Sequence, residues 1–193
     1  MENRILSILA ESLAVKDRSV KENLAKLETG ARRLAESLAS DHKVLIFGNG
    51  GSAADAQHIA AEFVNRFSIE RPPLAAIALT TDTSILTSIG NDYHFDDIFS
   101  KQIHALGKKG DVAWAISTSG NSANVVKGIE AAGEKKMTTF AMTGRGGRLA
   151  AMADLSLTVM SDSTARIQET HLIMAQILCE LVERILFPKH FKK

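Results

Sequence analysis

The sequence predicts a doubly wound α/β fold, in which helices cover both faces of a five-stranded parallel sheet behind a helical N-terminal extension. The apolar runs expected to form strands are continuous, which is typical of parallel strands buried on both faces. Segments in which apolar residues recur at helical spacing lie between these runs, and right-handed crossovers then make the sheet doubly wound. We expect residues 1–193 to form one domain and residues 1–40 to be its extension.

Two amphipathic helices are predicted in the extension, because apolar residues recur in it every three to four positions. Their apolar faces need a covering surface, which is either the body of the same domain or a second copy of the chain. The predicted strands cover residues 44–47, 74–79, 112–116, 138–142 and 155–159. The predicted helices after them cover residues 52–66, 83–105, 122–136, 147–152 and 164–186.

The composition excludes several classes of partner. The chain has 23 basic and 22 acidic residues, so its net charge of +1 gives no general attraction to nucleic acid or to an acidic membrane. Aromatic residues make up only 5%, too few for a base-stacking surface. The one cysteine, Cys179, fits a reducing compartment, and neither a long apolar segment nor a signal peptide is evident. We therefore expect a cytoplasmic protein.

A glycine-rich turn, Gly48-Asn49-Gly50-Gly51-Ser52, follows the first predicted strand. In open α/β sheets, ligands bind beyond the carboxyl ends of the strands, near the point where the strand order reverses. Glycines let the backbone approach a ligand, and Ser52 is expected to cap the next helix, whose start favours an anion. A tight turn that binds nothing is the alternative interpretation.

The third predicted strand runs into a hydroxyl-rich turn, residues 117–122, with the sequence STSGNS. Hydroxyl groups, amides and a helix start together suit a phosphate group, although serine-rich turns also cap helices without binding anything. Two donor-rich turns after strands of one sheet indicate a phosphorylated small molecule. A third turn, 143–148, is expected to be a surface loop, and Asn91-Asp92 is expected to lie in a turn where Asp92 can accept hydrogen bonds from a sugar.

The helix after the glycine-rich turn carries Asp55, His58 and Glu62 opposite its apolar face. Because His58 and Glu62 are four residues apart, they lie side by side and can share one metal ion or one proton path. A solvated polar face is the alternative, but the position directly after the turn favours a functional role.

The last predicted helix is apolar on nearly every side, so we expect it to be buried, between subunits. Gln168 and Gln176 lie about 12 Å apart along its axis, so they can reach one metal ion only at nearly full stretch or from different chains. His171 is expected to be a satisfied interface histidine. The polar residues that we regard as candidate site residues on this helix are Gln168, Glu169, His171 and Gln176.

Four segments, 48–63, 78–92, 117–125 and 166–172, resemble the bacterial phosphoheptose isomerases, which have a flavodoxin-like sugar isomerase (SIS) domain. The resemblance implies a cytoplasmic homotetramer with active sites between subunits and one zinc ion per subunit. It implies an aldose–ketose isomerase that converts sedoheptulose 7-phosphate to D-glycero-D-manno-heptose 7-phosphate for heptose and lipopolysaccharide precursor synthesis.

The resemblance also implies roles for individual residues. Glu62 falls on the position of the catalytic base, and Gln176 falls on the second catalytic position. The implied metal ligands are His58, Glu62, Gln168 and Gln176. The implied substrate-binding residues are Asn49, Gly50, Gly51, Ser52, Asp55, Glu62, Asn91, Asp92, Ser117, Thr118, Ser119, Ser122 and Gln168.

Gln176 departs from the family, which carries a histidine there as metal ligand and acid/base. A neutral amide does not exchange a proton near pH 7 and is a poorer zinc ligand than imidazole. The chain is therefore an isomerase that uses another acid, an engineered inactive variant, or a non-catalytic relative similar to replication-initiator-associating regulators, which the tail 186–188 resembles. A sugar-phosphate-sensing module is a weaker alternative. We favour the isomerase because His58, Glu62 and Gln168 occur together.

Overall fold

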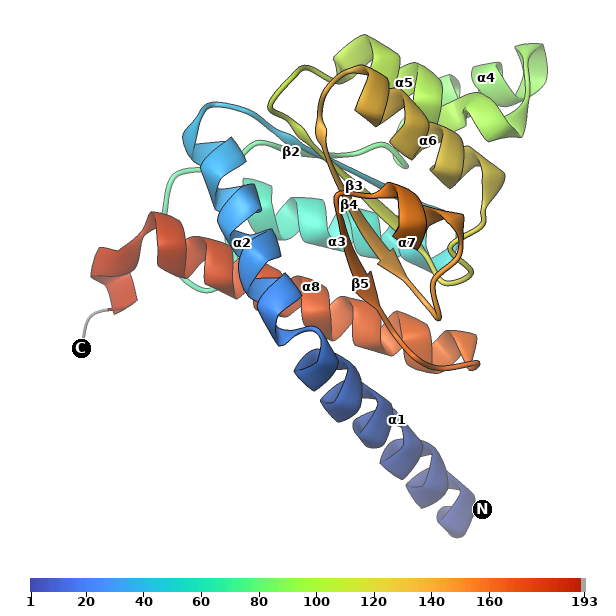
Figure 1. The fold of residues 1–193 in the computed structure, drawn as a ribbon, viewed down its shortest axis with the longest axis vertical. Helices are drawn as coiled ribbons and strands as arrows, with labels where there is room; N and C mark the ends of the chain where they lie inside the picture. The colour runs from blue at the N-terminus through green and yellow to red at the C-terminus, as the bar shows by residue number, and fades with distance from the viewer. Residues whose placement is uncertain (192–193) are drawn as a thin grey trace.

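The computed structural model describes residues 1–191 and has one parallel sheet with the strand order β2-β1-β3-β4-β5 (Figure 1). The strands are β1 (Val44–Gly48), β2 (Ala76–Ala78), β3 (Val112–Ser117), β4 (Thr138–Thr143) and β5 (Leu155–Thr158). The α-helices are α1 (Glu2–Glu22), α2 (Leu24–Ala39), α3 (Gly51–Val64), α4 (Thr83–Asp92), α5 (Ile98–Leu106), α6 (Ala123–Glu134), α7 (Arg148–Met152) and α8 (Thr164–Leu186). The predicted doubly wound fold is confirmed.

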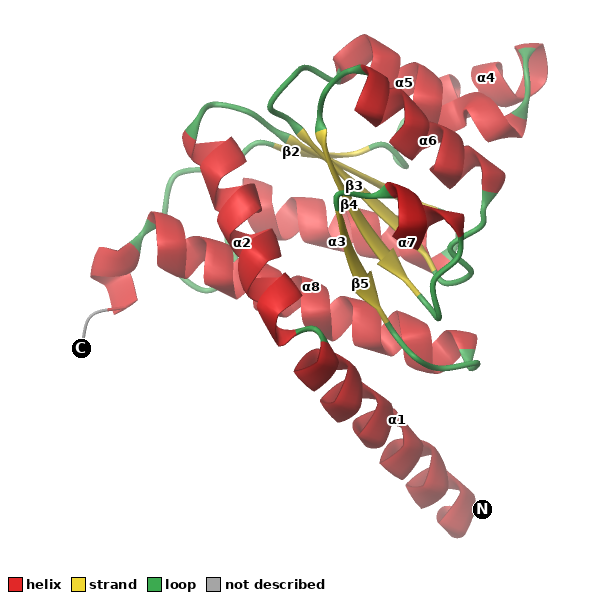
Figure 2. Cartoon of the chain, in the orientation of Figure 1, coloured by secondary structure: helices red, strands yellow, loops and turns green. Residues whose placement is uncertain are grey.

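Alternate residues of each strand supply two separate cores. Val44, Ile46 and Trp114 point to the face covered by α2, α3 and α8, whereas Leu45 and Phe47 point to the face covered by α5, α6 and α7 (Figure 2). Both sets are fully buried, because each face of the sheet packs against helices. This two-sided burial explains why the strands appear in the sequence as continuous apolar runs.

The strand order reverses between β1 and β3, where the carboxyl ends of the two strands lie against each other. Gly48 pairs with Ile116 across this junction. A Cβ atom at Gly48 would lie 2.6 Å from the Ile116 carbonyl oxygen and 2.8 Å from the Ser52 Cβ atom, so only glycine fits there. The turns after β1 and β3 are therefore direct neighbours.

The helical stretch predicted over residues 83–105 forms two helices, and the first of them ends at Asn91-Asp92, where the sequence predicted a turn. Helix α4 ends at Asp92, a short 3-10 turn covers Phe95–Asp97, and α5 then begins at Ile98. The Lys127 Nζ atom of α6 contacts Asp97 Oδ1 at 2.8 Å, which fixes the bend between the two helices. The pattern of apolar residues continues across the bend, so periodicity alone did not reveal it.

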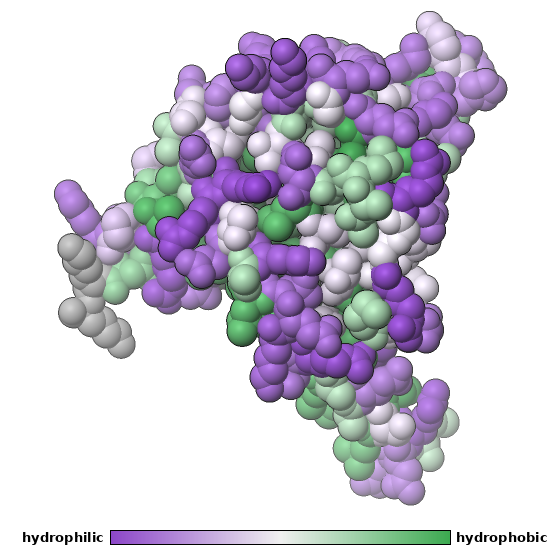
Figure 3. Space-filling model, in the orientation of Figure 1, coloured by the Kyte–Doolittle hydropathy of each residue, from purple (hydrophilic) through white to green (hydrophobic). Residues whose placement is uncertain are grey.

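Helix α1 extends beyond the body of the molecule, and its first half exposes apolar side chains (Figure 1, Figure 3). Only Ser12, Val15 and Ser19 of this helix are buried. Leu6 and Leu9 are 56% and 52% exposed. The body of the domain therefore covers part of the apolar surface of the extension and leaves the rest free for another molecule.

A polar cluster fastens α1 to the first turns of α8. The Ser12 hydroxyl donates to Glu169 Oε2 at 2.6 Å, and Arg166 Nη2 lies 2.6 Å from the other oxygen of that carboxylate. Arg166 also donates to the Ile8 carbonyl at 3.0 Å. Glu169 thus anchors the N-terminal helix, which gives this polar residue a structural role.

Helix α8 buries one face within its own chain, and His171 lies on that face, whereas Ile173, Ile177 and Leu181 are only half-buried. The His171 Nε2 atom donates to the Thr143 carbonyl at 3.1 Å, whereas its Nδ1 atom has no partner among residues 1–191. The expectation of a satisfied interface histidine is therefore wrong: the ring is enclosed by its own chain, and only one of its two nitrogen atoms has a hydrogen-bond partner.

None of the helices in the described range combines the length and apolar content needed to cross a membrane.

We expect His171 to make folding stability fall in acid. Burial lowers its pKa to about 4, and the hydrogen bond to Thr143 only partly opposes this shift. At pH values between the unfolded pKa near 6.5 and this folded pKa, the imidazole is protonated in the unfolded chain but neutral in the folded chain. The free energy of unfolding should therefore fall by about 3 kcal/mol from this residue alone as the pH drops from 7 to 4. Urea unfolding at several pH values measures this slope, and a His171→Gln variant with an equally steep slope would contradict the assignment.

Candidate functional site

The turn after β1 begins α3 earlier than the sequence predicted. Gly50 is the N-cap, with φ of 57°, and α3 begins at Gly51. Ser52 is not the cap: it lies inside the first turn, where its side chain is buried beneath Gly48. The left-handed conformation of Gly50 directs the backbone of this turn, and it leaves Gly51 exposed at the start of the helix.

A reciprocal amide pair ties this turn to α6. Asn49 Nδ2 donates to Asn124 Oδ1 at 2.8 Å, and Asn124 Nδ2 donates to Asn49 Oδ1 at 2.9 Å. Asn124 lies in the first turn of α6 and was not among the predicted site residues. It belongs to the motif 117–125, but nothing in its spacing indicated a partner 75 residues away.

The turn after β3 gathers its hydroxyl groups as predicted. Ser117 Oγ lies 3.1 Å from Ser122 Oγ and 3.4 Å from Ser119 Oγ. Ser122 is the N-cap of α6 but makes no capping bond with its side chain, so its hydroxyl faces the cluster instead. Thr118 is half-buried beside them, and its carbonyl accepts from the backbone N–H of Gly144. Hydroxyl donors at the start of a helix form a favourable environment for an anion.

The turn after β4 packs against the turn that carries the hydroxyl cluster. A Cβ atom at Gly147 would lie 2.7 Å from the Ser119 carbonyl oxygen, so the two turns are in close contact. Arg145 does not join the cluster, because it is exposed and its Nη2 atom binds Asp162 Oδ2 at 2.7 Å. This ion pair raises the pKa of Arg145 and lowers that of Asp162.

His58 and Glu62 form the expected pair on α3. His58 Nε2 lies 2.9 Å from Glu62 Oε1, with the imidazole well exposed and the carboxylate half-buried. Asp55 lies one turn earlier: burial raises the pKa of its carboxyl group, and the nearby His58 partly offsets that shift. The pair combines an acceptor and a donor of protons at a surface that is open to a substrate or a partner chain.

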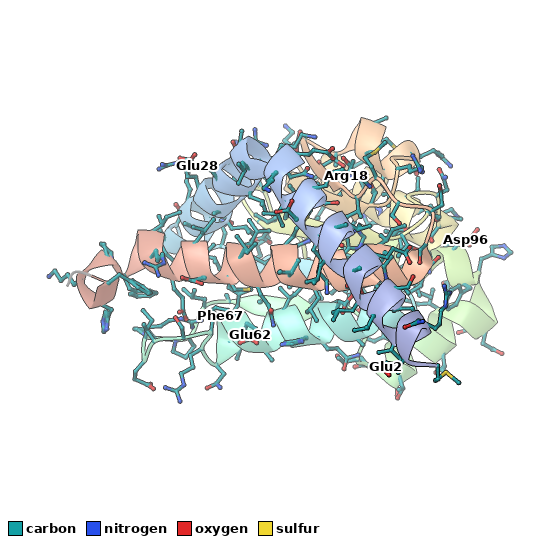
Figure 4. All side chains as sticks on the ribbon, turned by 90° about the horizontal axis from the view of Figure 1, so that it is seen from below. Glu2, Arg18, Glu28, Glu62, Phe67 and Asp96 are labelled. Carbon is teal, nitrogen blue, oxygen red and sulfur yellow. The ribbon has the colours of Figure 1, made fainter. Side chains whose placement is uncertain are left out.

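Helices α3 and α8 run side by side in the same direction, which brings some predicted residues together and separates others (Figure 1). At one end, a Cβ atom at Gly51 would lie 2.5 Å from Gln168 Nε2. At the other end, burial raises the pKa of Cys179 to about 12, and the charge of Glu62 adds to this shift. Gln176 lies one turn before Cys179 on α8, near the level of Glu62. Figure 4 shows Glu62 in this C-terminal part of α3, beside α8.

The donor groups of one chain do not fit a closed zinc site. Among residues 1–191, no group of three or more His, Cys, Asp or Glu side chains gathers around a common point. His58 and Glu62 supply two suitable donors. Gln176 offers only an amide oxygen, and so does Gln168, which lies about 12 Å before it along the axis of α8. Structural and catalytic zinc sites use three or four nitrogen, sulfur or carboxylate donors.

Asn91 and Asp92 are the last two residues of α4 and are exposed, so the predicted turn is helical here. Asn91 Nδ2 donates to Asp92 Oδ1 at 2.8 Å. A cavity of about 150 Å³ separates the glycine-rich turn from α4 and α5. It is lined by Gly48, Asn49, Gly50, Ala53, Thr80, Leu86, Phe95, Ile98 and Phe99.

Comparison with known proteins places the chain in a family. The family model of the SIS domain matches residues 9–144. The chain is 57% identical to a phosphoheptose isomerase of Nitratidesulfovibrio vulgaris over 86% of its length and 80% of that protein. It is 50% identical to the phosphoheptose isomerase of Thermodesulfovibrio yellowstonii over 97% of its length and 94% of that protein.

Solved structures agree with the sequence relatives. The phosphoheptose isomerase of Neisseria gonorrhoeae superposes with a TM-score of 0.89 at 47% identity, covering 94% of this chain and 98% of that one. The enzyme of Francisella tularensis gives a TM-score of 0.91 at 38% identity, covering 94% and 97% of the two chains. The chain therefore belongs to the phosphoheptose isomerase family of SIS-domain enzymes.

Proposed function

We propose that the chain interconverts sedoheptulose 7-phosphate and D-glycero-D-manno-heptose 7-phosphate. The observation that carries the proposal is the contact of 2.9 Å between His58 and Glu62 on the helix that follows the glycine-rich turn. The printed names of the relatives support a heptose phosphate as the substrate. We also place the enzyme in the cytoplasm and in the supply of heptose for lipopolysaccharide precursors, as the family resemblance implies.

The hydroxyl cluster is the proposed phosphate site. Ser117, Ser119 and Ser122 supply donors at the start of α6, where the helix dipole favours negative charge. The pair between Asn49 and Asn124 holds the glycine-rich turn next to this cluster. The sugar chain then lies along that turn. This arrangement binds a phosphate ester without a basic surface patch, in keeping with the net charge of +1.

Glu62 is the proposed base. Its carboxylate takes the proton from C1 of the ketose, which gives an enediol, and returns the proton to C2 to give the aldose. During the same conversion the hydroxyl on C1 loses its proton and the carbonyl oxygen on C2 gains one. His58 orients the Glu62 carboxylate through their hydrogen bond. Gln176 can donate a hydrogen bond to a substrate oxygen, but it cannot exchange a proton as a histidine does.

The spacing along α3 supports the proposal that a second chain completes the active site. Glu62 lies 11 residues after Gly51, about 16 Å along the helix axis. An extended heptose 7-phosphate spans about 10 Å from its phosphorus atom to C1, given ordinary C–C bond lengths. A sugar held by the hydroxyl cluster of one chain therefore reaches Glu62 of another chain. We propose that the assembly is a homotetramer with its active sites between subunits.

We propose that the site binds zinc only weakly. His58 and Glu62 are the residues that would hold it, and a partner chain would have to supply further donors. Because Gln176 replaces an imidazole with an amide, we expect the affinity for zinc to be low. The reaction steps above use side chains of the protein alone.

Replacing Gln176 with histidine is the first test. We expect Gln176→His to raise both turnover of sedoheptulose 7-phosphate and zinc content, because it restores an acid/base group and a ligand. General acid–base catalysis contributes about 10²- to 10⁴-fold, which sets the possible gain in kcat. Turnover and metal analysis of the purified proteins measure the two effects. If neither protein turns over while both fold, the isomerase proposal fails and a regulator that lacks catalysis is favoured.

Mixing two inactive variants tests the composite site. Glu62→Gln removes the base, and Ser119→Asp places a negative charge in the proposed phosphate site, so each should abolish activity alone. When the two are co-expressed, some sites combine an intact cluster with an intact Glu62, and we expect activity to return to a fraction of the wild-type value. A mixture as inactive as its components would show that each site is built from one chain.

The exposed apolar face of α1 should control assembly. We expect Leu6→Lys combined with Leu9→Lys to reduce the mass in solution from about four times the chain mass of 20.8 kDa to a smaller species. Burying two lysine charges in an apolar interface is strongly unfavourable. Light scattering after size exclusion measures the mass. Ser7→Lys is the matched control, since Ser7 is exposed on the opposite side of the helix and should leave the assembly intact. A double variant of unchanged mass would argue against this interface.

A further inference from the structure

A buried ion pair lies at the C-terminal end of α3, between Arg71 and Glu183. Arg71 Nε lies 3.1 Å from Glu183 Oε1, and both side chains are only 1% exposed. Neither residue belongs to the sequence motifs that identified the site. Burying two charges is costly unless further hydrogen bonds satisfy their remaining donors and acceptors. The surroundings of the pair supply these bonds.

The Glu183 carboxylate holds the segment that follows α3. It accepts from the backbone N–H groups of Phe67 at 2.9 Å, Ser68 at 3.0 Å and Ile69 at 3.3 Å, and from the Ser68 hydroxyl at 2.9 Å. Burial by itself raises the pKa of Glu183, but these hydrogen bonds outweigh it and hold the pKa below its ordinary value. Figure 4 shows Phe67 at this end of α3, close to Glu62.

The Arg71 guanidinium binds the last turn of α3 itself. It donates to the carbonyl oxygens of Glu62 at 2.7 Å, Phe63 at 2.6 Å and Asn65 at 3.2 Å. Carbonyl groups in the last turn of a helix lack partners within the helix, and a cation there also interacts favourably with the helix dipole. One of the carbonyls that Arg71 binds belongs to the residue proposed as the catalytic base.

The ion pair also sets the position of α3 along α8. Glu183 lies two turns after Gln176 on α8, so it continues the side of the helix that faces α3. Through Glu183 and Arg71, the backbone of Glu62 is fixed relative to the α8 residues at its level. The two opposite charges compensate each other, so the link does not leave a net charge beside the Glu62 carboxylate.

We propose that Arg71 and Glu183 are positioning residues that hold Glu62 in its catalytic orientation, an inference that rests on the proposed isomerase function. Displacement of a catalytic group by about 1 Å can cost about 100-fold in rate. The hydroxyl cluster lies beyond the opposite end of α3, so loosening the ion pair leaves phosphate binding unchanged. The signature of positioning is therefore a loss of kcat with an unchanged KM.

Arg71→Lys and Glu183→Gln in the full-length protein test the inference. Lysine keeps the charge but not the planar set of donors that joins the carbonyls to Glu183, and glutamine keeps the shape of Glu183 without its charge. We expect kcat to fall about 10- to 100-fold and KM to stay within about twofold. Hydrogen exchange should increase locally over residues 59–69. Unchanged kcat in both variants, or no local increase in exchange, would overturn the inference.

Two control variants separate positioning from general stability. Asp154→Asn weakens the bonds at 2.8 Å to the Thr139 backbone and hydroxyl, on a part of the sheet away from α3, and should lower Tm without lowering kcat. Arg184→Lys alters an exposed ion pair with Glu180 on α8 and should change neither. If Asp154→Asn lowers kcat as much as Arg71→Lys at a similar Tm, the effect is general destabilisation and the inference is overturned.

The test also distinguishes this inference from the proposed function. A wild-type protein that does not turn over sedoheptulose 7-phosphate contradicts the isomerase proposal. Hydrogen exchange then decides the positioning role by itself. An increase confined to residues 59–69 in Arg71→Lys and Glu183→Gln supports it, and an increase spread over the whole chain, or none, overturns it.

Discussion

The packing of α3 against α8 is the contact on which the rest of the site depends. At its N-terminal end, Gly51 lies beside Gln168, where an added Cβ atom would lie 2.5 Å from the nitrogen at the tip of the Gln168 side chain. At its C-terminal end the ion pair between Arg71 and Glu183 fixes the last turn of α3. Glu62 and His58 lie between these two anchors, so their positions follow from the packing of the helices.

The sheet beneath this helix pair explains why the binding turns lie together. The carboxyl ends of β1 and β3 are adjacent because the strand order reverses between them, and Gly48 permits their close approach. The amide pair between Asn49 and Asn124 then joins the two turns directly. The proposed phosphate ester would meet hydroxyls and a helix start at this junction, while Arg145 is paired with Asp162.

Two features of the chain support the proposed homotetramer. The hydroxyl cluster lies beyond the N-terminal end of α3, whereas Glu62 lies in the last turn of that helix. The first half of α1 presents leucine and isoleucine side chains to solvent. A second copy would cover this apolar face and bring the two halves of an active site together. Both features are consistent with the proposed homotetramer.

The sequence by itself determined the fold class, the order of the strands along the chain and the motif residues, because continuous apolar runs and helical spacing are local patterns. It also predicted the contact between His58 and Glu62, since residues four apart on a helix are neighbours. The predicted turn at Asn91-Asp92 indicated where α4 ends, but the contact between Asp97 and Lys127 that holds α5 at an angle to it forms only in the folded chain.

Only the tertiary structure decided the contacts between residues that are distant in the sequence. It paired Asn49 with Asn124 and Arg71 with Glu183, and it enclosed His171 within its own chain. It also set α3 beside α8, with Gln168 next to Gly51 and Glu62 near Cys179. These outcomes depend on how the helices cross the sheet, and no local pattern along the chain encodes that arrangement.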